Sequence, residues 1–165
     1  MSQLPRILLG LGLLSALSLQ ACSGRKPGSF PEGKVIQRTG GDPIFGVKDE
    51  DREMNAAIAK AQSTLGEFTT ELARPQKDTD YIVKVRFRTD NGSGEHIWLD
   101  QVRFDGGNVT GRLTDEPDAI ARYHKGQTVT APRVDITDWL ISGPAVTRGG
   151  YTQDVIDHRT ASGGR

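Results

Sequence analysis

The chain has 165 residues, with 21 lysines and arginines balanced by 21 aspartates and glutamates. This balance argues against general nucleic-acid binding, which requires a basic surface. The length and a hydrophobic content of 35% are sufficient for one folded domain with additional segments.

The first residues have the features of a signal peptide. Arg6 supplies a positive charge, and the apolar stretch over residues 7–19 is shorter than the ~20 residues of a membrane-spanning helix. The run Leu19-Gln20-Ala21-Cys22 resembles the bacterial lipobox. The resemblance implies cleavage after residue 21 and acylation of Cys22, and two or three acyl chains form a stable membrane anchor. A simple secretory signal with an incidental cysteine, or a buried helix, is the alternative.

Two further features refine this interpretation. Ser23 stands where lipoproteins retained in the inner membrane usually carry aspartate, so we expect a periplasm-facing protein anchored in the outer membrane of a bacterial cell envelope. Cys22 is also the only cysteine, and its acylation leaves no thiol for a disulfide, a metal site or a nucleophile.

Residues 22–46 are rich in Gly, Pro, Lys and Arg without sustained periodicity, which predicts a flexible tether. A short edge strand at Lys34-Val35-Ile36 is an alternative. Beyond Asp49, apolar residues recur at steps of four and three, as on one face of a helix. Gly66 interrupts this pattern, and the run Thr64-Leu65-Gly66-Glu67 has the form of a capping box. The sequence therefore predicts two helices, over 50–63 and 65–73.

From Tyr81 the apolar period changes to two, as in a half-buried strand. A three-residue loop at 91–93 would connect it to a second strand over 95–104. On the covered face this register pairs Phe87 with Ile97 and Val85 with Leu99. On the opposite face it pairs Arg88 with His96, Arg86 with Trp98, and Lys84 with Asp100.

A second three-residue loop, Asp105-Gly106-Gly107, would place Leu113 beside Leu99 and Arg112 beside Asp100. Further strands are predicted over 126–130, 134–141 and 151–156, followed by a disordered tail over 158–165. These elements predict an α+β fold, in which two N-terminal helices pack on one face of a mostly antiparallel, meander-type sheet of about five to six strands.

Several segments resemble the bacterial DUF2314 family. The similar segments are Glu53-Met54-Asn55-Ala56-Ala57-Ile58, Lys84-Val85-Arg86-Phe87, Glu95-His96-Ile97-Trp98-Leu99, Gly111-Arg112-Leu113, Glu116-Pro117, Ile136-Thr137-Asp138-Trp139 and Gly149-Gly150-Tyr151-Thr152. Asp115 departs mildly from the asparagine expected before Glu-Pro. The resemblance implies a domain over residues 47–157, which follows the signal peptide predicted over residues 1–21 and the tether, and it implies no particular activity.

The candidate functional surface is a basic face with an aromatic ring. Its predicted members are Lys84, Arg86, Arg88, His96, Trp98 and Arg112. Guanidinium groups beside an aromatic ring suit a carboxylate or phosphate ligand. The alternative is an ordinary solvated sheet face whose charges are neutralised by Asp100 and other carboxylates. Asp138 is expected to cap a turn, and Trp139 and Tyr151 to pack in the core.

A catalytic alternative uses Glu95, His96 and Glu116 in general acid–base hydrolysis. Glu95 and His96 are neighbours on a strand and point to opposite faces, so they cannot form a dyad by themselves. The three histidines lack metal-ligand spacing, and we expect no metal and no cofactor.

The sequence thus favours a non-enzymatic, lipid-anchored envelope domain that binds a protein or an anionic envelope component. A periplasmic hydrolase and an immunity-type protein that neutralises a toxin are the two alternatives.

Overall fold

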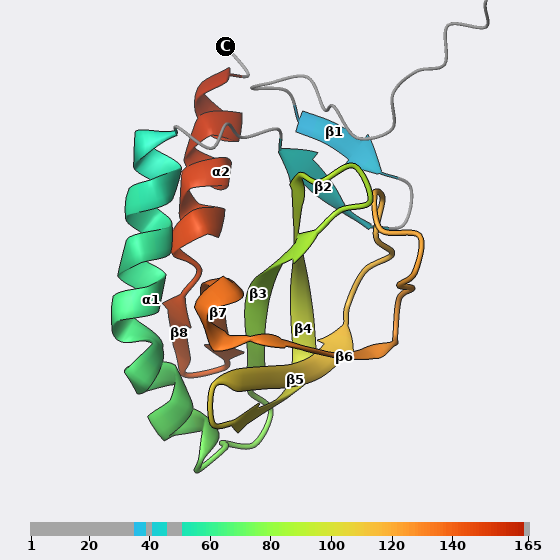
Figure 1. Cartoon of the computed structure of the whole chain (residues 1–165). Helices are drawn as coiled ribbons and strands as arrows, with labels where there is room; N and C mark the ends of the chain where they lie inside the picture. Colours follow the sequence, from blue (N-terminus) through green and yellow to red (C-terminus); the bar gives the residue numbers. More distant parts are fainter. Residues whose placement is uncertain (1–34, 39–40, 46–50, 164–165) are drawn as a thin grey trace, which may run out of the picture.

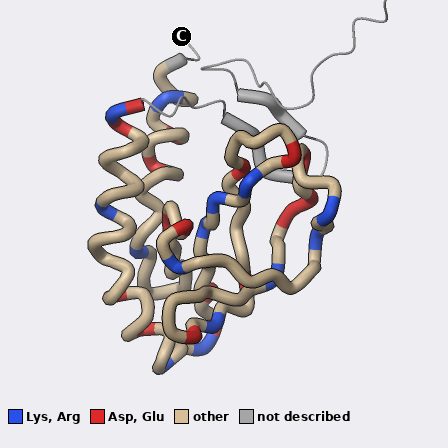
Figure 2. The backbone as a smooth tube through the Cα atoms, viewed as in Figure 1, with Lys and Arg blue, Asp and Glu red and all other residues tan. Residues whose placement is uncertain are grey.

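The computed structural model describes residues 35–38, 41–45 and 51–163, which form two sheets and two α-helices (Figure 1). The elements are β1 (Val35–Arg38), β2 (Gly41–Phe45), α1 (Arg52–Leu72), β3 (Asp80–Arg88), β4 (Gly94–Asp105), β5 (Asn108–Leu113), β6 (Thr128–Pro132), a 3₁₀ turn (Arg133–Asp135), β7 (Ile136–Gly143), β8 (Val146–Gly149) and α2 (Tyr151–Gly163). Figure 2 shows that basic and acidic residues are interspersed along the described chain.

The main sheet confirms the predicted antiparallel α+β architecture. Its six strands have the order β6-β5-β4-β3-β7-β8, and each neighbouring pair is antiparallel. Strands β3 to β6 form a meander, and β7 then returns across the sheet to pair with β3. β1 and β2 form a separate two-stranded sheet within the range for which a flexible tether is predicted.

The helices differ from the predicted pair in number and position. Residues 52–72 form one continuous helix, because Gly66 lies in its interior and the Thr64 hydroxyl donates to the carbonyl of Lys60 on the preceding turn instead of capping a new helix. Asp51 is the N-cap, and its side chain accepts from the backbone N–H of Met54 at 3.0 Å. The second helix, α2, is C-terminal.

The hydrophobic core lies between α1 and one face of the sheet. Phe68 of α1 is fully buried, and its ring centroid lies 5.7 Å from that of Trp139 and 6.2 Å from those of Tyr81 and Phe104. The indole N–H of Trp139 donates to the carbonyl of Ala61 at 3.0 Å. The predicted core role of Trp139 is therefore confirmed, and its hydrogen bond fixes α1 against β7.

The β3–β4 hairpin has the predicted faces but a different register. Val85 pairs with Ile97 rather than Leu99, a shift of two residues. The connecting turn is longer than predicted because it spans residues 89–93, with the backbone N–H of Thr89 donating to the carbonyl of Ser93 at 3.0 Å. An even shift keeps every side chain on its face, so Lys84 now lies beside Trp98 rather than Asp100.

The β4–β5 pairing has the predicted neighbours, although its turn is shorter than predicted. A bulge in β4 compensates for the shorter turn. The turn is one residue shorter than predicted, since Asp105 pairs with Asn108 around Gly106 and Gly107. A bulge between Asp100 and Arg103 adds one residue to β4, and Gln101 within it has a φ of 50°. Leu99 therefore pairs with Leu113, and Asp100 with Arg112, as predicted.

The C-terminal region corrects two predictions. Residues 151–163 form helix α2, so the predicted strand over 151–156 is wrong, and residues 158–163 of the predicted disordered tail are helical. Gly149 and Gly150 have φ angles of 82° and 75°, values that glycine adopts readily, and they turn the chain from β8 into the helix. α2 lies alongside α1 (Figure 1), and Arg159 near its C-terminal end forms ion pairs with Asp51 and Glu53 at the start of α1.

Candidate functional site

The β3–β4 ladder brings five of the six predicted binding residues together. Arg86 lies across from His96, and Lys84 across from Trp98, while Arg88 pairs with Gly94 at the end of the ladder. Because strand side chains alternate, these residues project from the face opposite the one that packs on α1. Lys84, Arg86, Arg88, His96 and Trp98 are called the basic–aromatic face below.

Lys84 is the buried member of this face. Only 7% of the residue is exposed, and its Nζ lies 4.5 Å from the centroid of the Trp98 ring, within the range of a cation–π contact. The same ammonium group donates to Oγ1 of Thr152 on α2 at 3.1 Å. Lys84 therefore connects the basic–aromatic face to the start of α2.

Asp138 provides the carboxylate at the start of α2. It is fully buried on β7, and its Oδ2 accepts from the backbone N–H of Thr152 at 2.8 Å and from the Thr152 hydroxyl at 2.6 Å. Its Oδ1 accepts from the backbone N–H groups of Trp139 and Tyr151. A carboxylate at a helix N-terminus satisfies unpaired amides and interacts favourably with the helix dipole. Asp138 thus caps a helix, where the sequence predicts the cap of a turn.

Arg86 and Arg88 are the exposed cations of the face. The side chain of Arg86 lies across Gly94, so a methyl group added to that glycine would collide with it. The Nη2 atom of Arg88 would lie 3.9 Å from a methyl group at Gly92. Neither guanidinium forms an ion pair with another described residue, whereas other arginines such as Arg112 and Arg122 are paired.

His96 is exposed on β4 and is positioned by β7. Its Nδ1 lies 3.0 Å from the hydroxyl of Thr137, a buried residue. The same hydroxyl lies 3.4 Å from the backbone carbonyl of Lys84 on β3. Thr137 therefore holds the imidazole beside the central strand.

Arg112 contributes no net charge to the face, because Asp100 neutralises it. Its Nε and Nη2 donate to the two carboxylate oxygens of Asp100 at 2.9 and 2.7 Å. This bidentate hydrogen bonding raises the pKa of Arg112. The predicted six-residue surface is therefore reduced to the five residues of β3 and β4.

The carboxylates of the catalytic alternative have structural partners. Glu95 accepts from the backbone N–H groups of Asp118 and Ala119 at 2.8 and 3.0 Å, and Glu116 accepts from the backbone N–H of Lys125 at 2.8 Å. His96 meets Thr137 on the opposite face of β4 from Glu95. These hydrogen bonds of Glu95, Glu116 and His96 are made to three different segments of the chain.

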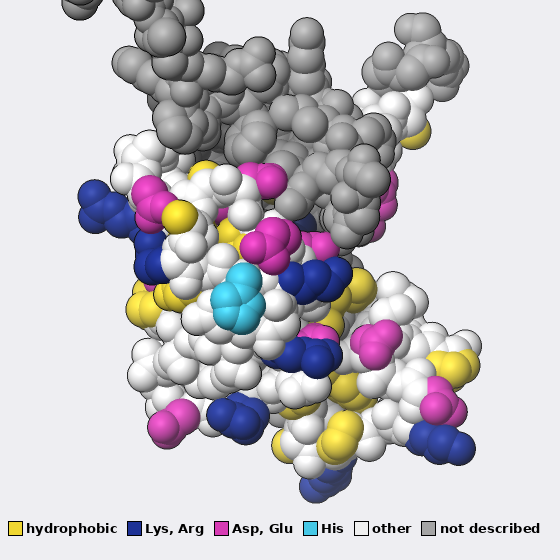
Figure 3. Space-filling view, turned by 90° about the vertical axis from the view of Figure 1, so that its right-hand side faces the viewer, with side chains coloured by type: hydrophobic (Ala, Val, Ile, Leu, Met, Phe, Trp, Pro, Cys, Tyr) yellow, Lys and Arg dark blue, Asp and Glu magenta, His cyan; other side chains and the backbone are white. Residues whose placement is uncertain are grey.

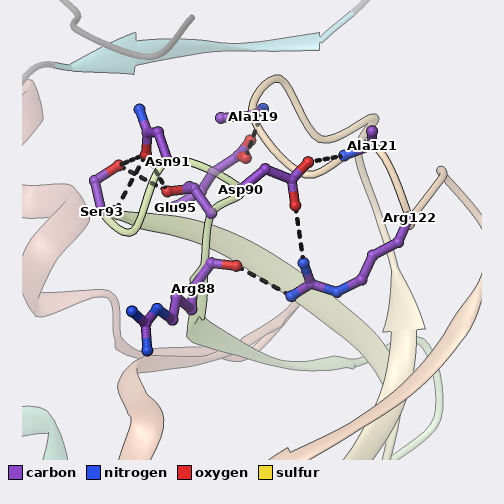
Figure 4. Close-up of polar contacts among 9 residues, drawn as sticks. Arg88, Asp90, Asn91, Ser93, Glu95, Ala119, Ala121 and Arg122 are labelled. Carbon is purple, nitrogen blue, oxygen red and sulfur yellow. Dashed lines mark hydrogen bonds and ion pairs between the residues drawn. The ribbon is translucent and has the colours of Figure 1, made fainter.

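The β3–β4 turn also fastens the long connection between β5 and β6 (Figure 4). Asp90 accepts from the backbone N–H of Ala121 at 3.0 Å and from the Arg122 guanidinium at 3.1 Å, and Arg122 donates in turn to the carbonyl of Arg88. In Figure 4 the side chain of Arg88 points away from this cluster. The backbone of the turn is therefore fixed while the Arg88 guanidinium projects outward.

Sequence reasoning misses the Asp138–Thr152 contact and the Arg159 ion pairs because both join residues distant in the chain. Residues 151–163 have no clear apolar stripe that would mark a helix, so only the turn at Gly149-Gly150 indicates a boundary at this point in the sequence. Among the described residues no group of acidic, histidine or cysteine side chains is arranged to hold a metal ion, and no described helix is long and apolar enough to cross a membrane. Cys22 lies outside the described residues.

Comparison with known proteins identifies the family. The family described as an uncharacterized protein conserved in bacteria (DUF2314) matches residues 51–165, so the chain belongs to it, and the match continues beyond the predicted boundary at residue 157. A Neisseria meningitidis serogroup B protein named "Putative ankyrin repeat protein" is 33% identical over 121 residues, which cover 68% of this chain and 48% of that protein. "Uncharacterized protein YegJ" of Escherichia coli K12 is 30% identical over 103 residues, which cover 62% of this chain and 66% of that protein. The chain thus spans about half the length of the Neisseria relative, and no solved structure matches it.

Proposed function

We propose that this DUF2314 protein is a lipid-anchored protein of the bacterial cell envelope, and that its domain binds an anionic partner without catalysing a reaction. The observation that carries the proposal is the pair of exposed guanidinium groups, Arg86 and Arg88, next to His96 and Trp98. Exposed arginines beside an aromatic ring suit carboxylate and phosphate groups, because the guanidinium can form two parallel hydrogen bonds.

The contrast with the other arginines supports this assignment. Arg112, Arg122, Arg148 and Arg159 each form an ion pair with a carboxylate of the domain. Arg86 and Arg88 have no such partner among the described residues, although their side chains are neighbours on one face of β3. Two adjacent cations without a described counter-ion repel each other, and a bound anion relieves that repulsion.

Binding is favoured over hydrolysis because Glu95 and Glu116 form hydrogen bonds with the backbone of the domain. Hydrolysis by a Glu–His pair requires the two side chains within hydrogen-bond reach of each other or of a shared water. Glu95 instead holds the backbone of residues 118 and 119, and Glu116 that of residue 125. A carboxylate that accepts hydrogen bonds from backbone amides stabilises the loop and is not available to a substrate as a base.

The anchor is tested by replacing its cysteine. Wild-type protein and the C22A variant are expressed with an alkyne fatty acid, and labelled lipoprotein is detected after membrane fractionation. The S23A variant is the matched control, because it changes the next residue and keeps the thiol. We expect label in the membrane fraction of wild type and S23A and none in C22A; label on C22A would contradict acylation at this residue.

The binding surface is tested by capture from an envelope extract. Full-length protein is crosslinked to the extract, and captured material is compared among wild type, the R86A/W98A variant and the R103A control, in which an exposed arginine elsewhere on β4 is removed. We expect R86A/W98A to lose the specific partner while its circular dichroism spectrum is unchanged. Equal capture by all three proteins would refute the assignment of the surface.

A further inference from the structure

We infer that the basic–aromatic face binds an extended acidic segment of a partner protein, in which two carboxylates are separated by one residue. This inference rests on the proposed binding function and specifies the chemistry of the partner.

The spacing of the two arginines carries the inference. Arg86 and Arg88 are two residues apart on β3 and project from the same face. Each strand residue advances the chain by about 3.3 Å, so their attachment points are about 6.6 Å apart. An extended peptide repeats its side chains at the same interval. Two carboxylates on alternate residues of such a peptide would therefore meet both guanidinium groups at once.

Glycines shape this end of the face for an approaching chain. Arg86 runs across Gly94, and Arg88 lies near Gly92. Neither glycine has a side chain that would stand above the sheet, so the arginines are flanked by backbone at this point. A ligand strand can approach closely enough for bidentate bonds to each guanidinium.

Trp98 defines the next position along the partner. It lies across from Lys84, two residues before Arg86 on β3, and the Lys84 ammonium contacts its half-buried ring. A peptide that meets Arg88 and Arg86 with two acidic side chains presents its next side chain on that face to Trp98. The ring favours an apolar residue there. The recognised segment of the partner therefore has five residues, with acidic residues at its first and third positions and an apolar residue at its fifth.

The surrounding charges favour a single chain over a flat anionic surface. Asp90 and Asp118 are exposed carboxylates at or near the tip of the same hairpin. Among the described residues, basic and acidic side chains are also interspersed on the side shown in Figure 3. A phospholipid surface would bring its phosphates against Asp118 and the Asp90–Arg122 ion pair as well as against Arg86 and Arg88. A strand lying along β3 would instead meet Arg88, Arg86 and Trp98.

The test uses fluorescently labelled peptides and the full-length chain in detergent. One peptide has two glutamates separated by a threonine, with a leucine two residues further on. A second has the same composition with adjacent glutamates, and a third has glutamines in their place. Anisotropy is measured for wild type, R86Q/R88Q and the control R103Q.

We expect the first peptide to bind wild type and R103Q at least tenfold more tightly than the other two peptides, and to bind R86Q/R88Q about a hundredfold more weakly, with binding that weakens as salt increases. Equal affinity for the two glutamate peptides would overturn the inferred spacing. Arginine-dependent binding to anionic phospholipid vesicles, with no peptide binding, would overturn the peptide inference and leave the proposed function standing. No retention of peptide, vesicle or envelope component would refute both.

Discussion

Asp138 on β7 accepts hydrogen bonds from both the backbone N–H and the hydroxyl of Thr152 on α2. The acid is fully buried, and Lys84 donates to the same hydroxyl. Removal of the Thr152 hydroxyl would leave the buried Asp138 carboxylate with fewer hydrogen bonds, and removal of Asp138 would leave the buried Lys84 ammonium without this nearby negative charge. Both changes are costly in a protein interior. This contact therefore determines where the C-terminal helix begins and how it meets the sheet.

Replacement of Asp138 should destabilise the domain strongly. We expect D138N to lower the free energy of unfolding by about 2–4 kcal/mol, because it removes the charge that the N–H groups of α2 and the Thr152 hydroxyl require. Urea denaturation followed by circular dichroism measures the change. D105N, at the exposed β4–β5 turn, should stay within about 0.5 kcal/mol of wild type. Similar stability of the two variants would contradict the role of Asp138 as a helix cap.

The Arg159 ion pairs should make stability depend on acid pH. The guanidinium hydrogen-bonded to Asp51 lowers the pKa of this carboxyl from 3.8 to about 2. Because the folded-state pKa is depressed, the contribution is complete above about pH 5 and is lost as the pH falls through 3.8 towards 2. Allowing for partial solvent exposure, we expect a contribution of about 1 kcal/mol.

The R159Q variant isolates this effect. At pH 7 it should be about 1–2 kcal/mol less stable than wild type, and the two stability curves should converge as the pH approaches 2. Chemical denaturation across pH 2–7 measures both curves. The R74Q variant, which changes an exposed arginine beyond the end of α1, is the control. Parallel curves for R159Q and wild type would show that the ion pair does not contribute.

Glu95 should stabilise the β5–β6 connection locally. The E95Q substitution weakens the bonds to the N–H groups of Asp118 and Ala119, and we expect a loss of about 1–2 kcal/mol. Amide hydrogen exchange should increase over residues 114–127 and remain unchanged in α1. E67Q, on the exposed side of α1, is the matched control. Unchanged exchange in residues 114–127 would contradict the stabilisation of this connection by Glu95.

Two glycines should respond to alanine in opposite directions. Gly66 lies inside α1 with open space at its Cβ position, so G66A should raise the free energy of unfolding by about 0.5–1 kcal/mol. Gly111 is buried on β5, and an added Cβ would lie 2.9 Å from the carbonyl oxygen of Asp100, so G111A should be destabilising. Thermal unfolding compares both. Destabilisation by G66A would indicate a break between two helices at this residue.

Alternation predicts the faces of the sheet well because a strand has a strict period of two. It places Lys84, Arg86, Arg88, His96 and Trp98 on one side, and the β3–β4 ladder confirms that placement. Register is less predictable, since it depends on the turn. The Thr89 hydroxyl donates to the Asn91 side chain at 2.6 Å, and such bonds within the turn determine its length.

The C-terminal helix could not be predicted from local pattern. Residues 151–156 include Tyr151, Thr152, Val155 and Ile156, which are residue types common in strands. The start of the helix is capped by Asp138 of β7, which lies 13 and 14 residues before the amides of Tyr151 and Thr152 that it binds, so the cap is not a local sequence signal. The reduction of the basic surface is different, because the sequence already predicts Arg112 beside Asp100, and the structure adds the two hydrogen bonds that neutralise Arg112.

The Arg159 contacts also determine how the domain responds to mechanical force. They join the start of α1 to the last part of α2, so the chain enters and leaves the domain at the same end (Figure 1). A pull applied to the chain before residue 51 therefore reaches the ion pairs of Arg159 before it reaches any strand of the main sheet. Loss of these ion pairs would release the adjoining ends of the two helices from each other, while the hairpin that carries Arg86 and Arg88 keeps its own ladder.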